Sequence, residues 1–162
     1  MKRVFLILMA ATLALAAACT PTPENGGGSA YRIRNADKVQ LRMLDSVNAL
    51  RQAAAAPQVQ LNAQLNAAAA THSLDMSVQN RPWHFGSDGS SPLDRVMRAG
   101  YTGTVQGENI SETYENELQT LTAWMEAPST RAVILDPKAT NMGFSWFQEA
   151  NGKIWWTLVM AN

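Results

Sequence analysis

Two residues of this 162-residue chain could do chemistry together: His84 and Glu108. His84 is one of only two histidines and lies in a turn-rich loop with few large apolar side chains. Glu108 stands in a Gly-Glu-Asn stretch, 24 residues further along, beyond a short helical segment. Loops held by a rigid frame often carry function. We therefore expect the two side chains to share a cleft, with Asn109 as a further candidate binding residue.

Three kinds of chemistry are open to such a pair. An imidazole nitrogen and a carboxylate oxygen can begin a divalent metal site, although zinc usually takes at least three protein ligands. A histidine and a glutamate can also do general acid–base work when burial and charged neighbours bring their pKa values toward neutrality. Alternatively, the pair is structural, because buried polar groups need hydrogen-bond partners. The spacing alone does not choose among these.

The remaining polar candidates are weaker. His72 lies on the apolar stripe of a predicted helix, which is typical of a hydrogen-bonded core histidine, with a role in the site as the alternative. Ser87, Ser90 and Ser91 lie near His84. However, the sequence has no G-x-S-x-G elbow, no glycine-rich phosphate loop and no H-E-x-x-H pair. A serine nucleophile is therefore not favoured.

The elements that must position these residues follow from apolar spacing and turn signals. The spacing predicts helices over 37–56, 61–79, 91–100 and 117–126, with one more helical turn at 131–135. It predicts an irregular strand over 104–112 and a hairpin with strands near 142–146 and 154–160, joined at Asn151-Gly152. Trp146, Trp155 and Trp156 could line a groove, but core packing is the more usual role for such strand residues. The fold class is therefore α+β, with helices packed against a small antiparallel sheet.

The N-terminus predicts export and anchoring. Residues 1–18 combine Lys2 and Arg3 with an apolar run and three alanines, which is typical of a signal peptide. Cys19 follows at once, resembling a bacterial lipobox, so we expect it to be lipidated. Residues 19–36 then form a flexible tether rich in Pro, Gly and Ser. Thr20 follows the cysteine, which favours the outer membrane if the cell is Gram-negative.

Charge and cysteine content narrow the classes further. The chain has 13 basic and 13 acidic residues, and removing Lys2 and Arg3 with the signal peptide leaves a net charge of −2. No basic stretch stands out, so nucleic acid is not an expected partner. Cys19 is the only cysteine, so no disulfide supports the fold and a packed core must. Residues 37–162 are enough for one domain.

Several motifs, taken in order, carry a resemblance to a known family. They are Asn48-Ala49-Leu50-Arg51, His72-Ser73-Leu74-Asp75-Met76, His84-Phe85-Gly86, Asp88-Gly89-Ser90-Ser91-Pro92, Asp94-Arg95, Ala99-Gly100-Tyr101, Gly107-Glu108-Asn109-Ile110, Trp124-Met125, Arg131 with Ile134-Leu135, and Trp156-Thr157. Over about residues 38–162 the chain resembles the bacterial branch of the CAP superfamily, the cysteine-rich secretory, antigen 5 and pathogenesis-related proteins, also called SCP-like extracellular proteins.

The resemblance implies an α-β-α sandwich with a central cleft. In many members two histidines and two glutamates line that cleft and can hold a divalent ion. His84 matches the first histidine and Glu108 the first glutamate. The second glutamate would fall near Ala127, beside Glu126, and the second histidine near Trp155. Two of the four residues therefore remain, so His84 and Glu108 supply only half of the ligands that such a zinc site has.

The resemblance also guides the expected function, because the family is mostly non-enzymatic where its role is understood. We expect a lipid-anchored, extracytoplasmic binding module whose cleft, lined by His84, Glu108, His72 and Asn109, takes a small lipid-like ligand or an envelope component. One alternative is a weak or metal-assisted hydrolase that uses His84 as base and Glu108 to orient it. The other is a structural envelope protein with a vestigial cleft. The membrane is the expected partner, through the lipid on Cys19.

Overall fold

The computed structural model describes residues 31–162. The predicted signal peptide (1–18), the lipidated Cys19 and residues 20–30 of the predicted tether lie outside the described residues and stay predictions. Among residues 31–162, no helix combines the length and the apolar content that a membrane span requires.

The described chain forms five helices and a four-stranded sheet. The helices are α1 (Ala36–Ala53), α2 (Ala63–Gln79), α3 (Pro92–Arg98), α4 (Glu117–Glu126) and α5 (Pro128–Leu135). The strands are β1 (Gln60–Leu61), β2 (Val105–Thr113), β3 (Asn141–Gln148) and β4 (Ile154–Ala161), in the spatial order β1-β3-β4-β2. β4 pairs antiparallel with β3, which confirms the predicted hairpin, and also pairs antiparallel with β2.

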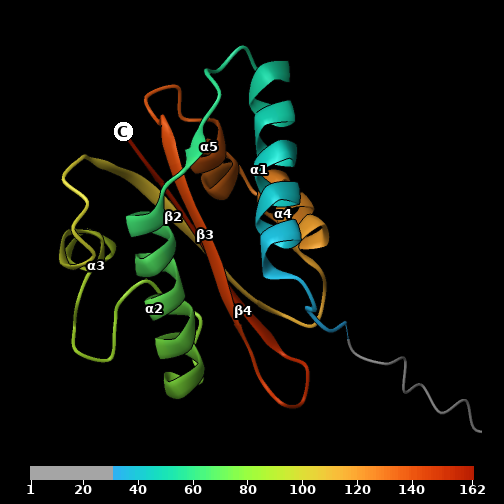
Figure 1. Ribbon diagram of the computed structural model, residues 1–162, viewed down its shortest axis with the longest axis vertical. Helices are drawn as coiled ribbons and strands as arrows, with labels where there is room; N and C mark the ends of the chain where they lie inside the picture. Colours follow the sequence, from blue (N-terminus) through green and yellow to red (C-terminus); the bar gives the residue numbers. More distant parts are fainter. Residues whose placement is uncertain (1–30) are drawn as a thin grey trace, which may run out of the picture.

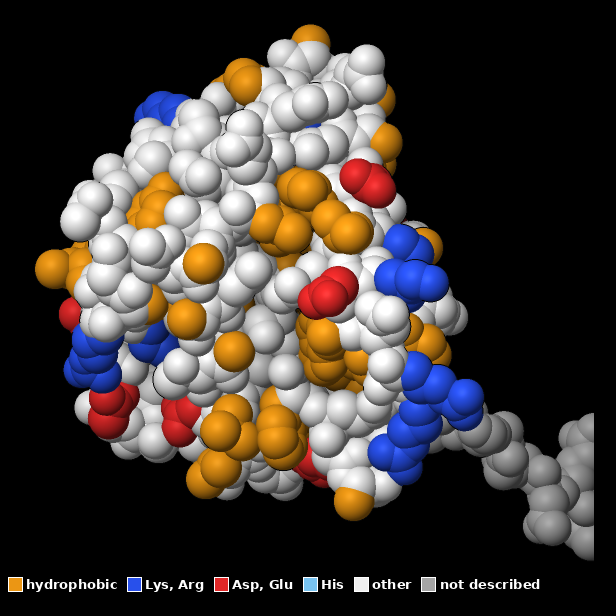
Figure 2. Space-filling view, viewed as in Figure 1, with side chains coloured by type: hydrophobic (Ala, Val, Ile, Leu, Met, Phe, Trp, Pro, Cys, Tyr) orange, Lys and Arg blue, Asp and Glu red, His pale blue; other side chains and the backbone are white. Residues whose placement is uncertain are grey.

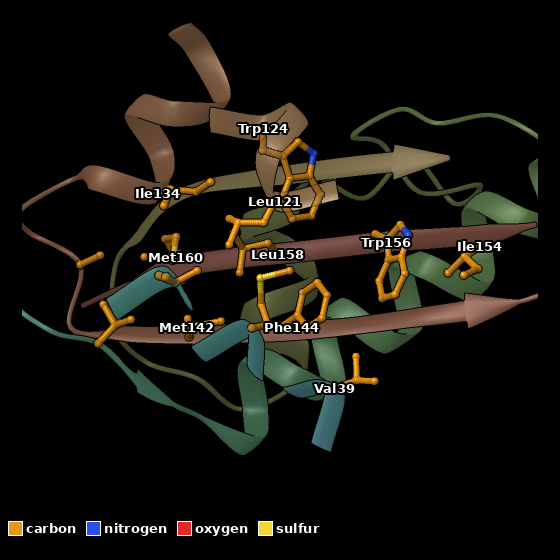
Figure 3. Close-up of a cluster of buried hydrophobic side chains, with 14 residues drawn as sticks. Val39, Leu121, Trp124, Ile134, Met142, Phe144, Ile154, Trp156, Leu158 and Met160 are labelled. Carbon is orange, nitrogen blue, oxygen red and sulfur yellow. The ribbon is translucent and has the colours of Figure 1, made fainter. Parts of the chain in front are cut away.

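Two layers of helices enclose the sheet, which confirms the predicted α+β sandwich. α2 and α3 cover one face, whereas α1, α4 and α5 cover the other (Figure 1). Along β4, alternate residues serve the two layers, because successive strand side chains point to opposite faces. Trp156, Leu158 and Met160 enter the larger core (Figure 3), while Val159 and Ala161 pack against α2 and α3. Trp155 and Trp156 are fully buried, so both are core residues.

Local signals explain most helix ends. Ser91 caps α3, because its hydroxyl accepts a hydrogen bond from the Asp94 N–H while the Asp94 carboxylate accepts one from the Ser91 N–H. Pro92 occupies the first turn, where its missing N–H costs nothing. α1 ends three residues before the predicted end, and Ala55 takes a left-handed conformation with φ of 56°. The predicted second helix starts two residues late because Leu61 instead pairs with Met142, which makes β1 a short parallel strand.

The chain that leads into α1 is held against the domain. The Tyr31 hydroxyl donates to Glu117 at 3.1 Å, and the Ile33 N–H donates to Gln148 at 3.1 Å. Tyr31 and Ile33 also pack against the larger core. Contacts with the domain therefore begin before the predicted helix. Figure 2 shows basic side chains along this edge of the molecule, where Figure 1 places the start of α1.

The position of α2, which carries His72, depends on a glycine of β3. A Cβ atom built on Gly143 would lie 2.2 Å from the backbone carbon of Leu65 in α2. Only glycine lets the helix lie this close to the sheet, since the opposing atoms are backbone that cannot rotate away. The close approach brings the buried side of α2 against β3 and β4.

We predict that Gly143→Ala lowers the free energy of unfolding by about 3 kcal/mol, because the added methyl must push α2 from the sheet. Chemical denaturation followed by tryptophan fluorescence measures the change. A loss below about 0.5 kcal/mol, the usual range for surface substitutions, would show that this contact does not fix α2.

Candidate functional site

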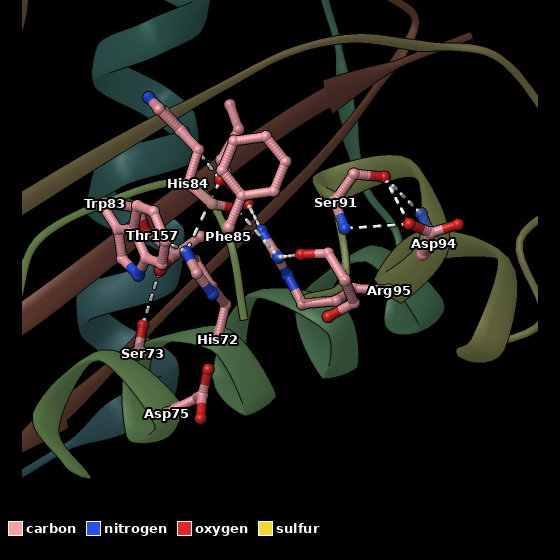
Figure 4. Close-up of polar contacts among 12 residues, drawn as sticks. His72, Ser73, Asp75, Trp83, His84, Phe85, Ser91, Asp94, Arg95 and Thr157 are labelled. Atoms are coloured by element: carbon pink, nitrogen blue, oxygen red, sulfur yellow. Dashed lines mark hydrogen bonds and ion pairs between the residues drawn. The ribbon is translucent and has the colours of Figure 1, made fainter. Parts of the chain in front are cut away.

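The carboxylate of Glu108 lies at the centre of the candidate site. Its Oε1 atom is 2.9 Å from Nδ1 of His84, and its Oε2 atom is 2.7 Å from an Nη atom of Arg95. Figure 4 shows His84 and Arg95 in this region. The structure therefore brings together the two residues that the sequence analysis singled out. It adds Arg95, which the sequence analysis named only within a motif and gave no role.

Arg95 holds the loop as well as the carboxylate. Its other Nη atom donates to the backbone oxygens of His84 and Ser90, each at 3.0 Å. The α3 helix presents Arg95 from its buried side, and the capped start at Ser91 fixes where that helix begins. One guanidinium thus connects β2, the loop before α3 and α3 itself. The fixed fork of five donors makes arginine suited to this task.

The hydrogen-bond partners of Glu108 determine which nitrogen of a neutral His84 ring carries the proton. The Glu108 side chain is 2% exposed, while that of His84 is 50% exposed. A buried carboxylate is tolerated when ionic and hydrogen-bonding partners surround it, and here Arg95 and His84 supply both. Since the ionised carboxylate only accepts, Nδ1 of neutral His84 carries the proton. Nε2 is then left with a free lone pair on the exposed side of the ring.

His72 lies beneath this pair and is fully buried. Its Nε2 atom donates to the backbone oxygen of Trp83 at 3.0 Å and lies 3.7 Å from Oε1 of Glu108. Among the described residues, its Nδ1 atom has no hydrogen-bond partner. Burial lowers the pKa of His72; the Glu108 charge opposes this shift and the Arg95 charge adds to it. His72 is therefore a neutral core residue that also supports the site from below.

Asn109 lies away from the pair, contrary to the expectation that it lines the cleft. It follows Glu108 on β2, so its side chain points to the opposite face of the sheet. Its amide donates to the backbone oxygen of Thr130 in α5 at 2.9 Å. Asn109 is thus a tie between β2 and α5, and strand alternation could have indicated this from the sequence.

A shallow, largely apolar pocket of about 500 Å³ opens beside His84. It lies between α3, the free edge of β2 and α5, and both His84 and Glu108 contribute to its lining. The apolar lining residues are Pro92, Leu93, Val105 and Val133. Gly107 helps to shape it, because a Cβ atom there would lie 2.6 Å from the Val133 side chain.

The side chains of two nearby serines are engaged in structural bonds, and a third serine is buried. Ser87 donates to Asp75 at 2.6 Å, and Ser91 donates to Asp94 at 2.7 Å. Ser90 is 6% exposed, and its N–H donates to Asp88. These serines shape the loop and the start of α3. Ser87 and Ser90 also border a separate hollow of about 370 Å³ between α2 and α3.

The comparison with known families decides what kind of domain this is. Residues 44–160 match the model of the CAP family, described as the cysteine-rich secretory protein family. The chain belongs to the CAP family. A relative from Bacillus subtilis (strain 168), described as the uncharacterized protein YkwD, is 28% identical over 114 residues. That match covers 70% of this chain and 44% of the relative, so the chain spans less than half of that protein.

Solved structures support the CAP fold. An extracellular protein containing an SCP domain from Bacillus anthracis matches with a TM-score of 0.69 and 20% identity, over 82% of this chain and 45% of that one. An outer surface protein from Borrelia burgdorferi matches with a TM-score of 0.68 and 11% identity, over 82% of this chain and 98% of that one. A cysteine-rich secretory protein from Staphylococcus aureus matches with a TM-score of 0.65 and 13% identity, over 80% of this chain and 40% of that one. At these identities the likeness concerns the fold.

The positions of the two absent cleft residues are filled structurally in this CAP domain. Trp155, where a second histidine would fall, is fully buried, and its N–H donates to Glu149 at 2.6 Å. The ammonium of Lys153 lies 4.3 Å from the centre of its ring. Ala127, where a second glutamate would fall, joins α4 to α5. Neither position offers a ligand.

The donor set does not fit a divalent metal. Within residues 31–162, no group of three or more His, Cys, Asp or Glu side chains is arranged to hold a metal ion. Oε2 of Glu108 is bound by the positive guanidinium of Arg95, which repels a cation, and Oε1 is bound by His84. His84 and Glu108 therefore do not supply a zinc site in this structure.

We predict that, because of His72, the free energy of unfolding decreases as the pH is lowered. The unfolded chain takes up the His72 proton near pH 6.5, whereas the folded chain does so only at lower pH, because its pKa is lowered. Between these values the unfolded state holds more protons, so the free energy of unfolding decreases as the pH drops, by at most about 1.4 kcal/mol per pH unit. Urea unfolding at several pH values, compared with His72→Gln, isolates this contribution. Equal slopes for the two proteins would contradict it.

Proposed function

We propose that this CAP domain is a non-enzymatic, extracytoplasmic binding module for a small, lipid-like molecule that bears a hydroxyl group. The observation that carries the proposal is the half-exposed His84 ring at the edge of an apolar pocket. Ligand sites combine an apolar lining with a few placed polar groups that fix orientation. Here the pocket walls supply the apolar surface and His84 supplies the polar group.

The ligand class follows from the hydrogen bond that His84 already makes. Its Nδ1–H is committed to Glu108, so Nε2 is an acceptor at neutral charge. An acceptor at the edge of an apolar pocket favours a hydroxyl or another uncharged donor on the ligand. Glu108 and Arg95 neutralise one another beneath it, which adds no net charge to attract an ionic ligand.

A weak hydrolase is the second candidate, since one observation favours it. A carboxylate that fixes the histidine tautomer is the arrangement in which Nε2 can serve as a general base. The hydroxyls of Ser87 and Ser91 donate to Asp75 and Asp94, and Ser90 is buried, so the nucleophile of this candidate hydrolase would be water. The binding role needs no such step, and it is the function that the site supports better.

We infer further that the domain is displayed on a membrane by a lipid on Cys19, after removal of residues 1–18. The support is the sequence of that segment, together with relatives described as extracellular or outer surface proteins. Within residues 31–162, Tyr31 already contacts the domain, and residues 20–30 lie between it and the cysteine in the sequence.

Loss of the His84 acceptor should weaken binding of hydroxylated ligands. With a fluorescent long-chain alcohol as probe, we predict that His84→Ala raises Kd by about five- to tenfold, the value of one hydrogen bond. The methyl ether of the same probe, which cannot donate, should bind both proteins equally. Val133→Ser is the matched control, because a damaged apolar wall should weaken both probes alike.

The His84→Ala variant also distinguishes the binding role from the hydrolase and the structural role. If His84→Ala leaves probe binding unchanged but abolishes turnover in a screen of ester and amide substrates, the hydrolase replaces the binding module. If it changes only the free energy of unfolding, the cleft is vestigial and the domain has a structural role.

The anchor has its own test. Cys19→Ser should move the protein from the membrane fraction to the soluble fraction, because the acyl chains can no longer be attached. Fractionation followed by immunoblotting reads the result, with Ser29→Ala as a control substitution in the same segment. A variant that stays with the membrane would show that something other than this lipid holds it.

A further inference from the structure

The surroundings of Glu108 contain an unexpected combination of groups. Two imidazole nitrogens approach the same oxygen: Nδ1 of His84 lies 2.9 Å from Oε1, and Nε2 of His72 lies 3.7 Å from it. Histidine nitrogens and glutamate oxygens are atom types that bind zinc in proteins. However, Nε2 of His72 donates to the backbone oxygen of Trp83, and within residues 31–162 no three such side chains are arranged to hold a metal ion. The other oxygen of the same carboxylate is held by Arg95.

Several hydrogen bonds hold the guanidinium of Arg95 in place. Its side chain is 5% exposed, and its guanidinium lies 2.7 Å from Oε2 of Glu108. Two backbone oxygens, those of His84 and Ser90, hold its other Nη atom. To make room for a metal ion, the guanidinium would have to give up these bonds and leave a buried charge without its partner, which is strongly unfavourable.

We propose that Arg95 is the specificity-determining residue of this cleft: its guanidinium takes the place of a cation beside Glu108 and keeps divalent metals out. The negative charge of Glu108 is thereby neutralised by a residue of the same chain. His84 then remains a hydrogen-bond acceptor for an uncharged ligand, which is where this inference rests on the proposed function. The exclusion of metal itself needs no ligand and can be tested separately.

Removing the charge of Arg95 should therefore increase zinc binding. Arg95→Gln removes the positive charge and frees Oε2 of Glu108, so the carboxylate can take a cation without repulsion from the guanidinium. In the purified full chain carrying Cys19→Ser, which removes the thiol as a competing ligand, zinc titration by calorimetry should show at least about tenfold tighter binding for Arg95→Gln than for the parent. Adding His84→Ala to Arg95→Gln should abolish the gain.

Two controls separate the charge of Arg95 from its structural role. Arg95→Lys keeps a positive charge at the site and should still exclude zinc. Arg98→Gln removes a neighbouring arginine on the same helix that pairs with Asp88, not with Glu108, and should gain no zinc binding. Circular dichroism establishes which variants are folded.

Where Arg95→Gln does not fold, Arg95→Ala provides a second route. It leaves a gap that free guanidinium ion can fill, so dilute guanidinium chloride should weaken zinc binding by this variant while the same concentration of sodium chloride should not. The proposal is overturned if the parent chain binds one equivalent of zinc with perturbed His84 and His72 imidazole signals in its NMR spectrum. It is equally overturned if a folded Arg95→Gln variant binds no more zinc than the parent. Loss of alcohol-probe binding alone would count against the proposed function and leave this result intact.

Discussion

The ion pair between Glu108 and Arg95 is the constraint on which the site depends. A carboxylate that is 2% exposed is costly to desolvate, and a guanidinium bonded to it at 2.7 Å offsets that cost. The same guanidinium holds the loop that carries His84 and lies on the helix that Ser91 caps. The position of His84 is therefore a consequence of how Glu108 is neutralised, and the pocket beside it forms where β2, α3 and α5 meet.

Two of the four expected cleft positions carry His84 and Glu108, and the other two are filled by structural residues. Trp155 and its bond to Glu149 fill the position of a second histidine, and Lys153 lies over the tryptophan ring between Glu112 and Glu149. Burial alone would lower the pKa of Lys153, but the two carboxylates outweigh it and the pKa is raised. This end of the sheet is stabilised by internal charge pairing. Ligand recognition is left to the apolar pocket and to one imidazole acceptor.

Much of the fold could be predicted from local sequence signals. Ser91-Pro92 and Asn151-Gly152 specify a helix start and a hairpin turn through their own backbone preferences, and both lie where predicted. β1 could not be predicted in this way, because two residues pair with Asn141 and Met142 only after the chain has folded. The meeting of His84 with Glu108 was suggested by residue type. The role of Arg95 was not, since an arginine on a short helix gives no sign of the carboxylate it will neutralise.

The central claim is that Glu108, balanced by Arg95, fixes the tautomer and orientation of His84. The most direct test is a long-range proton–nitrogen NMR spectrum of the imidazole side chains at a pH where His84 is neutral. The account predicts a protonated, hydrogen-bonded Nδ1 and an unprotonated Nε2 for His84, with this pattern lost in Glu108→Gln. A His84 ring protonated on Nε2, or one unaffected by Glu108→Gln, would contradict it.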